Sequence, residues 1–411
     1  MKNKYYIYLL TLILAAESIY ILPYVLARVF RPTFLDIFNL TNLELGSLFS
    51  TYGIVAFLSY LYGGVIADKF SPRKLLSYSL IFTSFGGIVM MAYPSYVVMH
   101  LLYAYWGFTT VFLFWAPMIK ATTVIGGEKK QGKTFSFLDA GRGLVASSIG
   151  IIGVIIFSLV MVNDISAATI DNKKEAFKYV IGFSSLIVFI IGIFVNYSLR
   201  IDSSKGHIIG NLDEMKKLFK SKSVIYIGLI ILCAYMGYKI TDIYSLYASE
   251  VMMFDDIESA KVGAYQQYLR PIVCLIIAIY TDKTGNINNI VYGFKIMLVG
   301  SLLFASGVIT FSLNSLFIFS LIIVAIGTYT VRGLYFSILR DGKIPIILSG
   351  TAIGIVSIIG YTPDIFATPL YGYLLDTYPG ITGHQLVYLV LTMFSLIGIY
   401  VSLKFKKLNN L

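Results

Sequence analysis

Charged side chains interrupt several of the long apolar stretches of this chain. A Lys or Arg at the centre of a bilayer costs about 2.5 to 3.5 kcal/mol, so such a residue is retained for pairing or for function. Basic residues outnumber acidic ones in these stretches, and a cavity that they shared would carry a net positive charge and attract an anion. The basic residues are Arg28, Lys120, Arg142, Lys239, Arg270, Lys295 and Arg332, and the acidic residues are chiefly Glu17, Asp139, Asp242 and Asp364.

Two of these cations occupy matching positions in the two halves of the chain. Arg28 and Lys239 each lie deep in the first apolar stretch of their half, and each follows aromatic residues. Membrane proteins built from repeated halves hold ligands between the halves near the midplane, so this pair predicts a clamp for an anion. A local ion pair is the alternative, because Asp242 lies one helical turn after Lys239 and could neutralise it.

The remaining cations lie where structural roles compete with ligand binding. Lys295 is early in its stretch, and we expect its ammonium group to reach the membrane surface. Lys120 and Arg332 lie near the ends of their stretches, where each fits a gate or a surface charge as well as a ligand. Arg270 precedes Pro271, whose ring opens the helical hydrogen-bond ladder. Arg270 can therefore pair with freed carbonyl groups, with an acid or with a ligand.

Membrane-spanning helices are the elements that must position these residues. Hydrophobic residues make up 57% of the chain and charged residues only 13%, with a mean hydropathy of +0.80, whereas soluble domains carry about 25% charged residues. About twelve apolar runs reach the roughly 20 residues that a spanning helix needs. The runs lack the period-two alternation of a membrane barrel. They predict an all-α integral membrane fold of twelve transmembrane helices in two pseudo-symmetric six-helix bundles.

The distribution of basic residues predicts how the chain sits in the membrane. The net charge is +11, and outside the apolar runs the Lys and Arg residues gather on one side. The positive-inside rule then places both termini in the cytoplasm. The polar stretch 200–222 separates six runs from six. It predicts an N-terminal bundle over 1–199, a cytoplasmic linker over 200–222 and a C-terminal bundle over 223–411.

Other classes of function find little support in the sequence. The three His residues are far apart and both Cys residues lie inside apolar runs, so we expect no metal, no cofactor and no catalytic residue. An intramembrane enzyme is therefore not expected. The basic segments are short and scattered, without the aromatic platform of a nucleic-acid module, so we expect no nucleic-acid partner despite the positive charge.

A charged hairpin recurs in the two halves, first over 63–74 and then, in degraded form, over 278–285. The first copy resembles the signature loop of the major facilitator superfamily between helices two and three, where an Asp and basic residues latch the ends of neighbouring helices. The resemblance implies the same latch role in both copies, weaker in the second because Ala278 replaces the leading Gly. The latch positions are Asp68, Arg73 and Lys74 in the first copy and Asp282 and Lys283 in the second.

Within that superfamily the chain is similar, along nearly its whole length, to the organophosphate:phosphate antiporters. The two substrate-binding Arg residues of that branch fall on Arg28 and Lys239, its functional His falls on Arg142, and 350–361 resembles its Gly-rich helix eleven. The resemblance implies a phosphate ester as substrate. Because Lys lacks the planar fork of Arg, a carboxylate, a sulfonate or a sugar acid fits as well. Candidate partners for the body of the substrate are Tyr24, Tyr235, Tyr238, Tyr361 and Gln266 or Gln267.

The resemblance also implies a secondary active transporter that moves a small organic anion across a bacterial cytoplasmic membrane by alternating access. Transport would proceed by anion exchange, with inorganic phosphate as counter-substrate, or by coupling to protons. We expect a monomer whose partners are the small-molecule anion and the lipid bilayer. A proton-coupled transporter of a neutral or zwitterionic solute, such as a sugar, an amino acid or a peptide, is the alternative. The candidates for carrying a proton or pairing a cation are Glu17, Asp139, Asp242 and Asp364.

Overall fold

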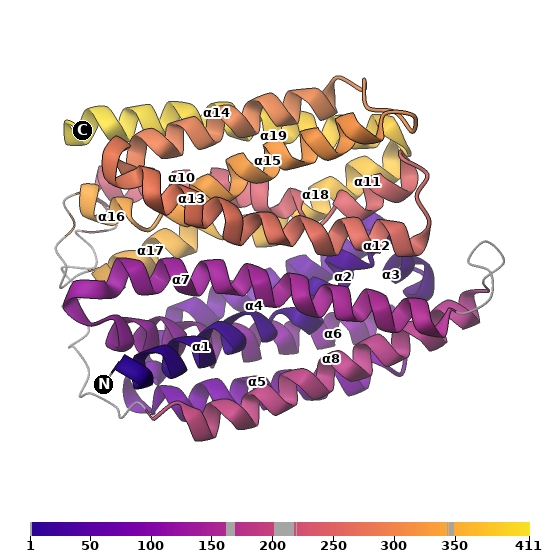
Figure 1. Cartoon of the computed structure of the whole chain (residues 1–411), viewed down its shortest axis with the longest axis horizontal. Coiled ribbons are helices and arrows are strands. Elements are labelled where there is room, and N and C mark those ends of the chain that lie inside the picture. The colour runs from indigo at the N-terminus through magenta and orange to yellow at the C-terminus, as the bar shows by residue number, and fades with distance from the viewer. Residues whose placement is uncertain (1, 162–168, 201–217, 219, 343, 345–348) are drawn as a thin grey trace.

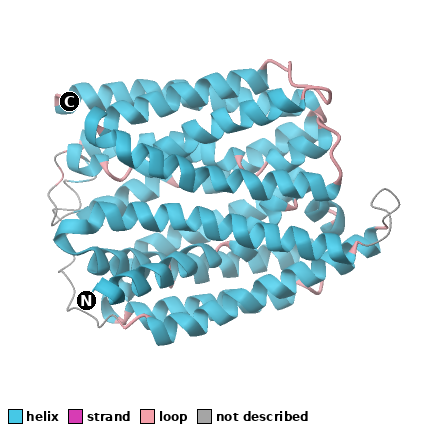
Figure 2. Cartoon of the chain, viewed as in Figure 1, coloured by secondary structure: helices cyan, strands magenta, loops and turns pink. Residues whose placement is uncertain are grey.

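The structure is a computed structural model of the chain, and it describes residues 2–161, 169–200, 218, 220–342, 344 and 349–411. Among these residues every regular element is a helix and none is a strand (Figure 2). Within lipid only helices and closed barrels satisfy all backbone polar groups. The prediction of spanning helices is therefore confirmed.

The helices of the first half run back and forth along the molecule. The segments η1 and η2 are single π-helical turns. α7 includes the bend between two spans, where Gly127 adopts a φ of 55° that a residue with a side chain rarely takes. The order is α1 (Lys2–Ser18), η1 (Ile21–Val25), α2 (Leu26–Val29), α3 (Arg31–Phe38), α4 (Asn42–Lys69), α5 (Pro72–Met90), α6 (Tyr96–Gly107), η2 (Phe108–Phe112), α7 (Trp115–Val160) and α8 (Ile170–Ser198).

The helices of the second half repeat this pattern of long spans broken by short turns. Here η4 is a single 3₁₀ turn that joins two α-helices. The order is α10 (Lys222–Ile240), α11 (Tyr244–Glu250), α12 (Asp256–Tyr265), η4 (Gln266–Tyr268), α13 (Leu269–Thr284), α14 (Asn286–Ala305), α15 (Asn314–Leu334), α16 (Ile338–Asp341), α17 (Ser349–Gly360), α18 (Pro363–Thr377) and α19 (Ile381–Asn409).

The spans that these helices form account for the predicted twelve. In the described part of the chain, eight helices are long and apolar enough to cross a membrane, and the bent pair Lys4–Ser18 and Ile21–Val29 makes a ninth. α4 and α5, with 28 and 19 residues, are long enough for two more. The continuous run of α12, η4 and α13 supplies the last. The twelve-helix, two-bundle fold is confirmed.

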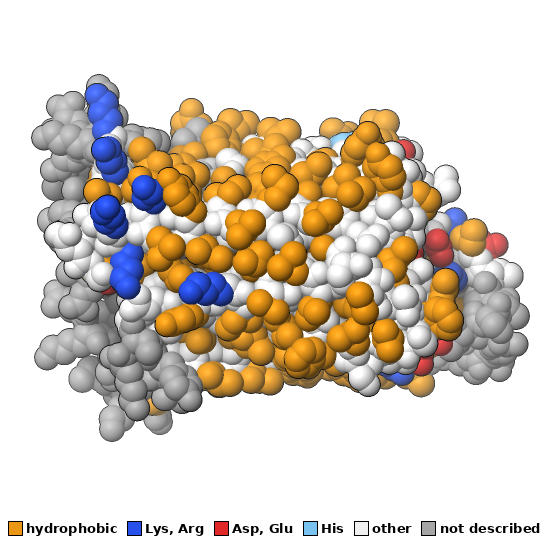
Figure 3. Space-filling view, turned by 90° about the horizontal axis from the view of Figure 1, so that it is seen from above, with side chains coloured by type: hydrophobic (Ala, Val, Ile, Leu, Met, Phe, Trp, Pro, Cys, Tyr) orange, Lys and Arg blue, Asp and Glu red, His pale blue; other side chains and the backbone are white. Residues whose placement is uncertain are grey.

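The helices lie side by side, and both ends of the chain lie at the same end of the molecule, which we call the terminal end (Figure 1). We call the opposite end the distal end. Hydrophobic side chains cover the middle of the face seen in Figure 3, while Lys and Arg gather toward the terminal end and Asp and Glu appear at the distal end. The basic residues thus accompany the termini, as the positive-inside argument requires. Which side of the membrane each end faces stays a prediction.

Two large hydrophobic clusters and a small third one, around Tyr238 and Tyr329, fill the interior of the described part of the chain. The first contains residues from Leu9 to Leu199 and also Ile257, Ala260 and Ala264 of α12. The second extends from Leu218 to Phe405. The predicted boundaries of the two bundles stay a prediction, because 201–217 and 219 of the linker lie outside the described residues.

Close helix packing joins the two halves at the distal end. A Cβ atom added to Gly46 of α4 would lie 2.5 Å from the carbonyl oxygen of Thr368 in α18, and one added to Gly372 would collide with the carbonyl of Asn42. Asp376 accepts two backbone N–H groups at the start of α4, at 3.0 and 2.7 Å. A carboxylate is favoured there because the N-terminus of a helix carries partial positive charge. The distal end is therefore closed between α4 and α18.

Candidate functional site

A cavity lies between the two halves near the middle of the helices. The space open to the centre of a water-sized molecule is about 50 Å³, which holds only a few waters because side chains fill the rest. A larger ligand can enter only if some of these side chains move. The residues that line the cavity are Glu17, Tyr20, Tyr24, Val25, Arg28, Tyr52, Tyr60, Trp115, Arg142, Tyr235, Tyr238, Lys239, Arg332, Tyr361 and Asp364.

Helix breaks position several of these residues. Between α1 and α2, the π turn contains Pro23, which has no N–H to donate, and carries Tyr24. Asp242 lies in the turn between α10 and α11. A third break separates α17 from α18, which begins with Pro363 and Asp364. Discontinuous helices of this kind form binding sites near the bilayer midplane, since their broken turns expose polar groups to a cavity.

Arg28 and Asp242 form a buried ion pair that links the two halves. Nε of Arg28 lies 2.6 Å from Oδ1 of Asp242, and the two side chains are 4% and 1% exposed. Nη1 of Arg28 donates a hydrogen bond of 3.0 Å to the hydroxyl of Tyr238. Removing one member of such a pair leaves an uncompensated charge and costs about 3–5 kcal/mol. The pair therefore neutralises Arg28 in this conformation.

Lys239 is also paired, chiefly with Asp364. Its Nζ lies 2.6 Å from Oδ1 of Asp364 and 3.9 Å from the nearer carboxylate oxygen of Asp242. The hydroxyl of Tyr235 donates to both oxygens of Asp364, at 3.1 and 3.2 Å. The ammonium group also lies 4.6 Å from the ring centroid of Tyr24, a contact that favours a cation. The local pair with Asp242 exists but is the longer of the two.

A second charged cluster joins α1, α7 and α13. Nε of Arg142 donates to Glu17 at 2.9 Å, and Nη1 of Arg142 lies 3.9 Å from Asp139. Arg270, from the other half, contacts Asp139 directly through Nη2 and places Nη1 3.5 Å from Glu17. Arg270 therefore pairs with acidic side chains, which is one of the three roles expected for it. Beside the cavity, ion pairs between described residues therefore cross the halves at two places.

Arg332 differs from the other cations of the cavity. No described carboxylate lies within 4.0 Å of its guanidinium group, and its Nε and Nη1 are buried without a hydrogen-bond partner in the described part of the chain. The group lies 3.8 Å from the ring centroid of Tyr238. A buried polar group without a partner costs about 1–3 kcal/mol, and more when it is charged. Arg332 lies two residues before the end of α15 and also lines the cavity, so of the roles left open for it a ligand is favoured.

Aromatic rings from both halves close the cavity toward the terminal end. Tyr60 stacks on Tyr361 with centroids 5.9 Å apart, and Trp115 meets the same ring edge to face at 5.9 Å. Tyr60 follows Tyr52 by eight residues, and a helix rises about 1.5 Å per residue, so Tyr60 lies on the terminal side of the cavity. These three rings, Tyr60, Trp115 and Tyr361, form what we call the aromatic wall.

Seven of the eight residues predicted to bind substrate line the cavity. The exception is Gln266, which is not among the described residues that line it. Its Oε1 accepts a hydrogen bond of 3.1 Å from the hydroxyl of Tyr329, and its Nε2 donates to the carbonyl of Gly263 at 3.3 Å. The 3₁₀ turn η4 thus holds Gln266 against α15 and α12, and its role as a ligand stays a prediction. The seven are Arg28, Arg142, Lys239, Tyr24, Tyr235, Tyr238 and Tyr361.

Two further cations lie outside the cavity lining. Nζ of Lys120 donates to the carbonyl of Ala67 at 2.9 Å, which joins α7 to α4. Lys295 is exposed, and its ammonium group lies 5.6 Å from the ring centroid of Tyr292. Its exposure agrees with the expected extension toward the membrane surface.

The latch positions lie near the terminal end. Arg73 and Lys74 occupy the first turn of α5, half-buried and exposed respectively. Their predicted latch with the preceding helix stays a prediction, because the acid proposed for it has no described side chain. The side chains that lie outside the described part of the structure are those of Asp68, Asp282 and Lys283.

Five lining residues were not predicted from the sequence, although one of them, Tyr20, carries a local signal. Tyr20 lies three residues after Glu17 and four before Tyr24, so all three share one helix face that continues to Arg28. The chain has 32 Tyr residues, and most are expected to pack in the core or to lie at the membrane interface. The spacing of one Tyr is therefore a weak indication of a binding role. The missed lining residues are Tyr20, Val25, Tyr52, Tyr60 and Trp115.

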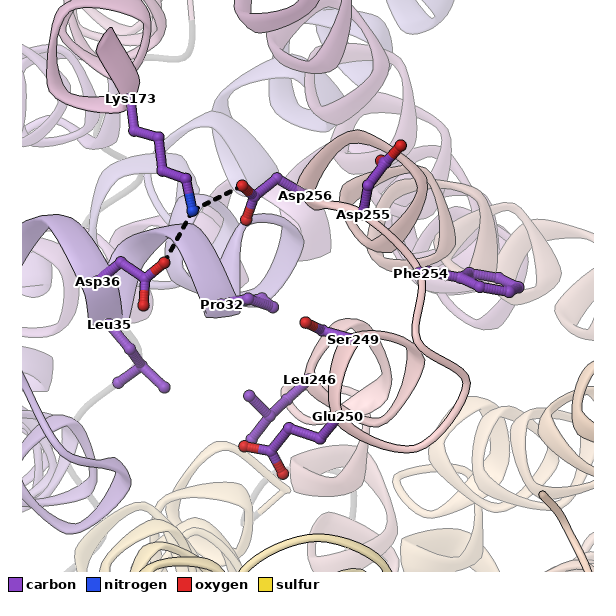
Figure 4. Close-up of a pocket in the computed structure, with 10 residues that line it drawn as sticks. All are labelled: Pro32, Leu35, Asp36, Lys173, Leu246, Ser249, Glu250, Phe254, Asp255 and Asp256. Atoms are coloured by element: carbon purple, nitrogen blue, oxygen red, sulfur yellow. Dashed lines mark hydrogen bonds and ion pairs between the residues drawn. The ribbon is translucent and has the colours of Figure 1, made fainter. Parts of the chain in front are cut away.

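A second pocket lies at the distal end and shares no lining residue with the central cavity. There the ammonium group of Lys173 lies between Asp36 and Asp256 (Figure 4), at 2.9 and 2.8 Å. Thr33 donates to the same Asp256 at 3.1 Å. Because Lys173 and Asp36 belong to the first half and Asp256 to the second, this network ties the halves together beside the closure of α4 and α18.

Two helical bundles with a charged, aromatic-lined cavity between them have the architecture of a membrane transporter. The sequence profile of the Major Facilitator Superfamily matches residues 9–343. The chain belongs to that superfamily and is an integral, multi-pass membrane protein.

Relatives and solved structures agree with this assignment. The chain is 25% identical over 380 residues to the inner membrane protein YqcE of Escherichia coli (strain K12), covering 90% of this chain and 87% of that protein. It is 26% identical over 423 residues to the inner membrane protein YihN of the same strain, covering 99% and 96%. A bacterial homologue of the human lysosomal transporter Spinster, in an inward-facing and occupied conformation, superposes with a TM-score of 0.76 at 12% identity over 98% and 97% of the two chains. The nucleoside transporter NupG gives 0.71 at 14% identity over 97% and 98%. At such identities the structural likeness shows the fold alone.

Proposed function

We propose that this chain carries a small organic anion through the central cavity by alternating access. The charge of the cavity lining and of the side chains that form ion pairs with it supports this function: five basic side chains meet four acidic ones, which leaves one positive charge in excess. A carboxylate, a sulfonate, a phosphate ester or a sugar acid would supply the missing negative charge. The resemblance to the organophosphate:phosphate antiporters favours the same class. The basic members are Arg28, Arg142, Lys239, Arg270 and Arg332, and the acidic members are Glu17, Asp139, Asp242 and Asp364.

Movement of the two halves would open the cavity to each side in turn. Opening toward the distal end requires α4 and α18 to separate and the network around Lys173 to break. Opening toward the terminal end requires the aromatic wall to part. The cross-half pairs of Arg28 and Arg270 lie between these closures. An anion that replaces a carboxylate as these pairs separate would lower the free energy of the intermediate state.

Anion exchange is the form of coupling that these ion pairs favour. Glu17, Asp139, Asp242 and Asp364 are all paired with a cation. Protonating any of them would release a buried positive charge, whereas exchange of one anion for another needs no titrating acid. Inorganic phosphate is one candidate counter-substrate. Proton coupling through these same four acids is the alternative.

We also propose that the terminal end faces the cytoplasm of a bacterium and that the protein works as a monomer in the cytoplasmic membrane. The gathering of basic side chains at that end supports the orientation. Both relatives from Escherichia coli are inner membrane proteins. In this orientation the latch of Asp68, Arg73 and Lys74 would act on the cytoplasmic side.

A neutral ring-shaped solute is the second candidate cargo. Four of the five cations are already paired, and the cavity lining is rich in Tyr rings. Such rings stack on sugars and bases without any need for charge. The fold is also that of NupG, a nucleoside transporter.

Thermal unfolding of the purified protein separates the two candidates. Two sets of compounds would be compared, each with an anion, a neutral molecule and an amine built on one body. The six-carbon set is gluconate, glucose and glucosamine. The aromatic set is benzoate, benzyl alcohol and benzylamine. We expect the anion of at least one set to raise the unfolding temperature, because a ligand that binds only the folded state stabilises it by about 2.7 kcal/mol at 100 times its Kd. Stabilisation by the neutral or amine member without the anion would overturn the proposal.

A further inference from the structure

We infer that Arg332 binds the cargo and that the cavity selects cargo with a single negative charge. This inference rests on the proposed transport of an organic anion and narrows it. It concerns a residue near the C-terminal end of α15, three positions after Tyr329. It does not concern the symmetric pair of Arg28 and Lys239.

The surroundings of Arg332 hold its guanidinium group in place without satisfying it. The ring of Tyr238 lies 3.8 Å away, and the hydroxyl of that ring accepts a hydrogen bond from Arg28, which fixes the ring. A ring face attracts the positive charge but accepts no conventional hydrogen bond. Nε and Nη1 of Arg332 therefore stay buried without a partner among the described residues. Water can satisfy these N–H groups, but only an anion can also neutralise the charge.

The charges around Arg332 set the valence of that anion. Arg28 is matched by Asp242 and Lys239 by Asp364. In the second cluster, the two cations Arg142 and Arg270 are matched by two acids, Glu17 and Asp139. One positive charge, that of Arg332, is left for the ligand. A carboxylate, a sulfonate or a sulfate ester would neutralise it.

A dianion would instead leave one negative charge in a site that holds only a few waters. Uncompensated charge is strongly disfavoured where protein atoms replace solvent. A phosphate monoester at alkaline pH is such a dianion, since its second pKa is about 6. The charges of the site therefore select against the form of the phosphate ester that dominates at pH 8. A singly protonated phosphate ester would be accepted.

Matched sulfate and phosphate esters test this selection on the full-length protein. Calorimetric titration of the purified protein would compare glucose 6-sulfate with glucose 6-phosphate, and phenyl sulfate with phenyl phosphate, at pH 8 and at pH 5. With a second pKa of about 6, about 1% of a phosphate ester is monoanionic at pH 8 and about 90% at pH 5. We expect the sulfate to bind about 100-fold more tightly than the phosphate at pH 8 and about equally at pH 5. The sulfate stays a monoanion throughout and reports any titration of the protein itself.

Two variants connect the selection to Arg332. Arg332→Gln is expected to weaken binding of the sulfate at least about tenfold, since it removes the unpaired charge. Arg332→Lys keeps the charge and is expected to keep the preference for the sulfate at pH 8. Lys295→Gln, at an exposed position, serves as a control with unchanged binding.

The outcomes separate this inference from the proposed function. If the phosphate binds as tightly as the sulfate at pH 8, or if Arg332→Gln binds the sulfate like the wild type, the inference is overturned while anion transport stands. If glucose or phenol binds and neither ester does, the proposed function falls as well. The wild-type comparison needs no variant, so poor folding of Arg332→Gln does not weaken the test.

Discussion

The ion pair of Arg28 and Asp242 shows how single charged residues are kept inside the membrane-spanning part of this chain. The two residues lie 214 positions apart in the sequence and meet at 2.6 Å. Each charge alone would be expensive in a low-dielectric interior, whereas the hydrogen-bonded pair is tolerated. The same pairing holds Lys239 against Asp364. Only Arg332, of the cations lining the cavity, has no described acid within 4.0 Å.

Asp242→Asn is expected to lower the free energy of unfolding by about 3–5 kcal/mol, because it leaves the charge of Arg28 buried without a partner. The double variant Arg28→Gln/Asp242→Asn removes both charges and is expected to recover part of this loss. Thermal unfolding in detergent measures both, with Lys295→Gln as an exposed control. A double variant less stable than either single variant would contradict the pairing.

Tyr24→Phe separates a role in substrate binding from a role in stability. The Tyr24 hydroxyl is buried without a hydrogen-bond partner in the described residues, while its ring lies beneath Lys239. Removing the hydroxyl costs the folded protein nothing, but it would cost a bound substrate about 1 kcal/mol of hydrogen bonding, or about fivefold in KM. We expect an unchanged unfolding temperature and a raised KM in a transport assay. An unchanged KM would exclude the hydroxyl as a ligand.

Local spacing predicted much of the site but not its connections. The matching positions of Arg28 and Lys239 identified two lining cations, and the three-residue spacing identified the weaker contact of Lys239 with Asp242. The cross-half partner of Arg28 could not be read from spacing, since it depends on how the halves meet. The role of Arg332 stayed open in the sequence because its apolar run ends nearby: α15 ends two residues later, although helical structure resumes in α16 as far as Asp341.

Among the helices, α4 and α18 approach each other closely and close the distal end. Gly46 and Gly372 let backbone contact backbone across the halves. Such close backbone contact forms only where no Cβ atom stands between the helices.

Gly46→Ala is expected to destabilise the closed distal end by about 1–3 kcal/mol, because its Cβ atom has no room against the backbone of α18. Spin labels at Ile170 and Phe311, exposed positions in the two halves near the distal end, would report the separation. We expect the distance distribution to shift toward longer values. Gly354→Ala is the control, since nothing lies within 4 Å of the added atom. Equal distributions for both variants would rule out this closure.

The elements themselves were predictable to different degrees. Long apolar runs predict spanning helices because the solvent for most of their length is lipid, which tolerates no open backbone. The break at Pro363 agrees with the restriction that proline imposes on a helix. The turn that holds Asp242 contains neither Gly nor Pro, so no local signal in the sequence indicated this helix break. Packing against the other half accounts for the break, because Asp242 forms an ion pair with Arg28 there.

In the molecule as a whole, the two ends differ in the charge of their surface side chains. Basic side chains gather with both termini at one end, and acidic side chains appear at the other (Figure 3). Chains insert with their basic segments on the cytoplasmic side. The orientation of the entire molecule therefore follows from surface residues that have no part in the cavity.

Fusions to the C-terminus test this orientation. In a bacterial host, green fluorescent protein fused after Leu411 is expected to fluoresce, and alkaline phosphatase at the same position is expected to stay inactive, because the first folds in the cytoplasm and the second needs an oxidising compartment. The reverse pattern would place the terminal end outside and invert the proposed orientation.

Counterflow in proteoliposomes tests whether the cavity between the halves carries an organic anion. Vesicles containing the purified protein would be loaded with the best-binding anion and diluted into a trace of the same labelled anion. We predict a transient accumulation of label that Arg332→Gln loses and Lys295→Gln keeps. Counterflow of a neutral solute with none of any anion would show that the cavity does not carry an organic anion. Undiminished anion counterflow in Arg332→Gln would overturn the role of Arg332 alone.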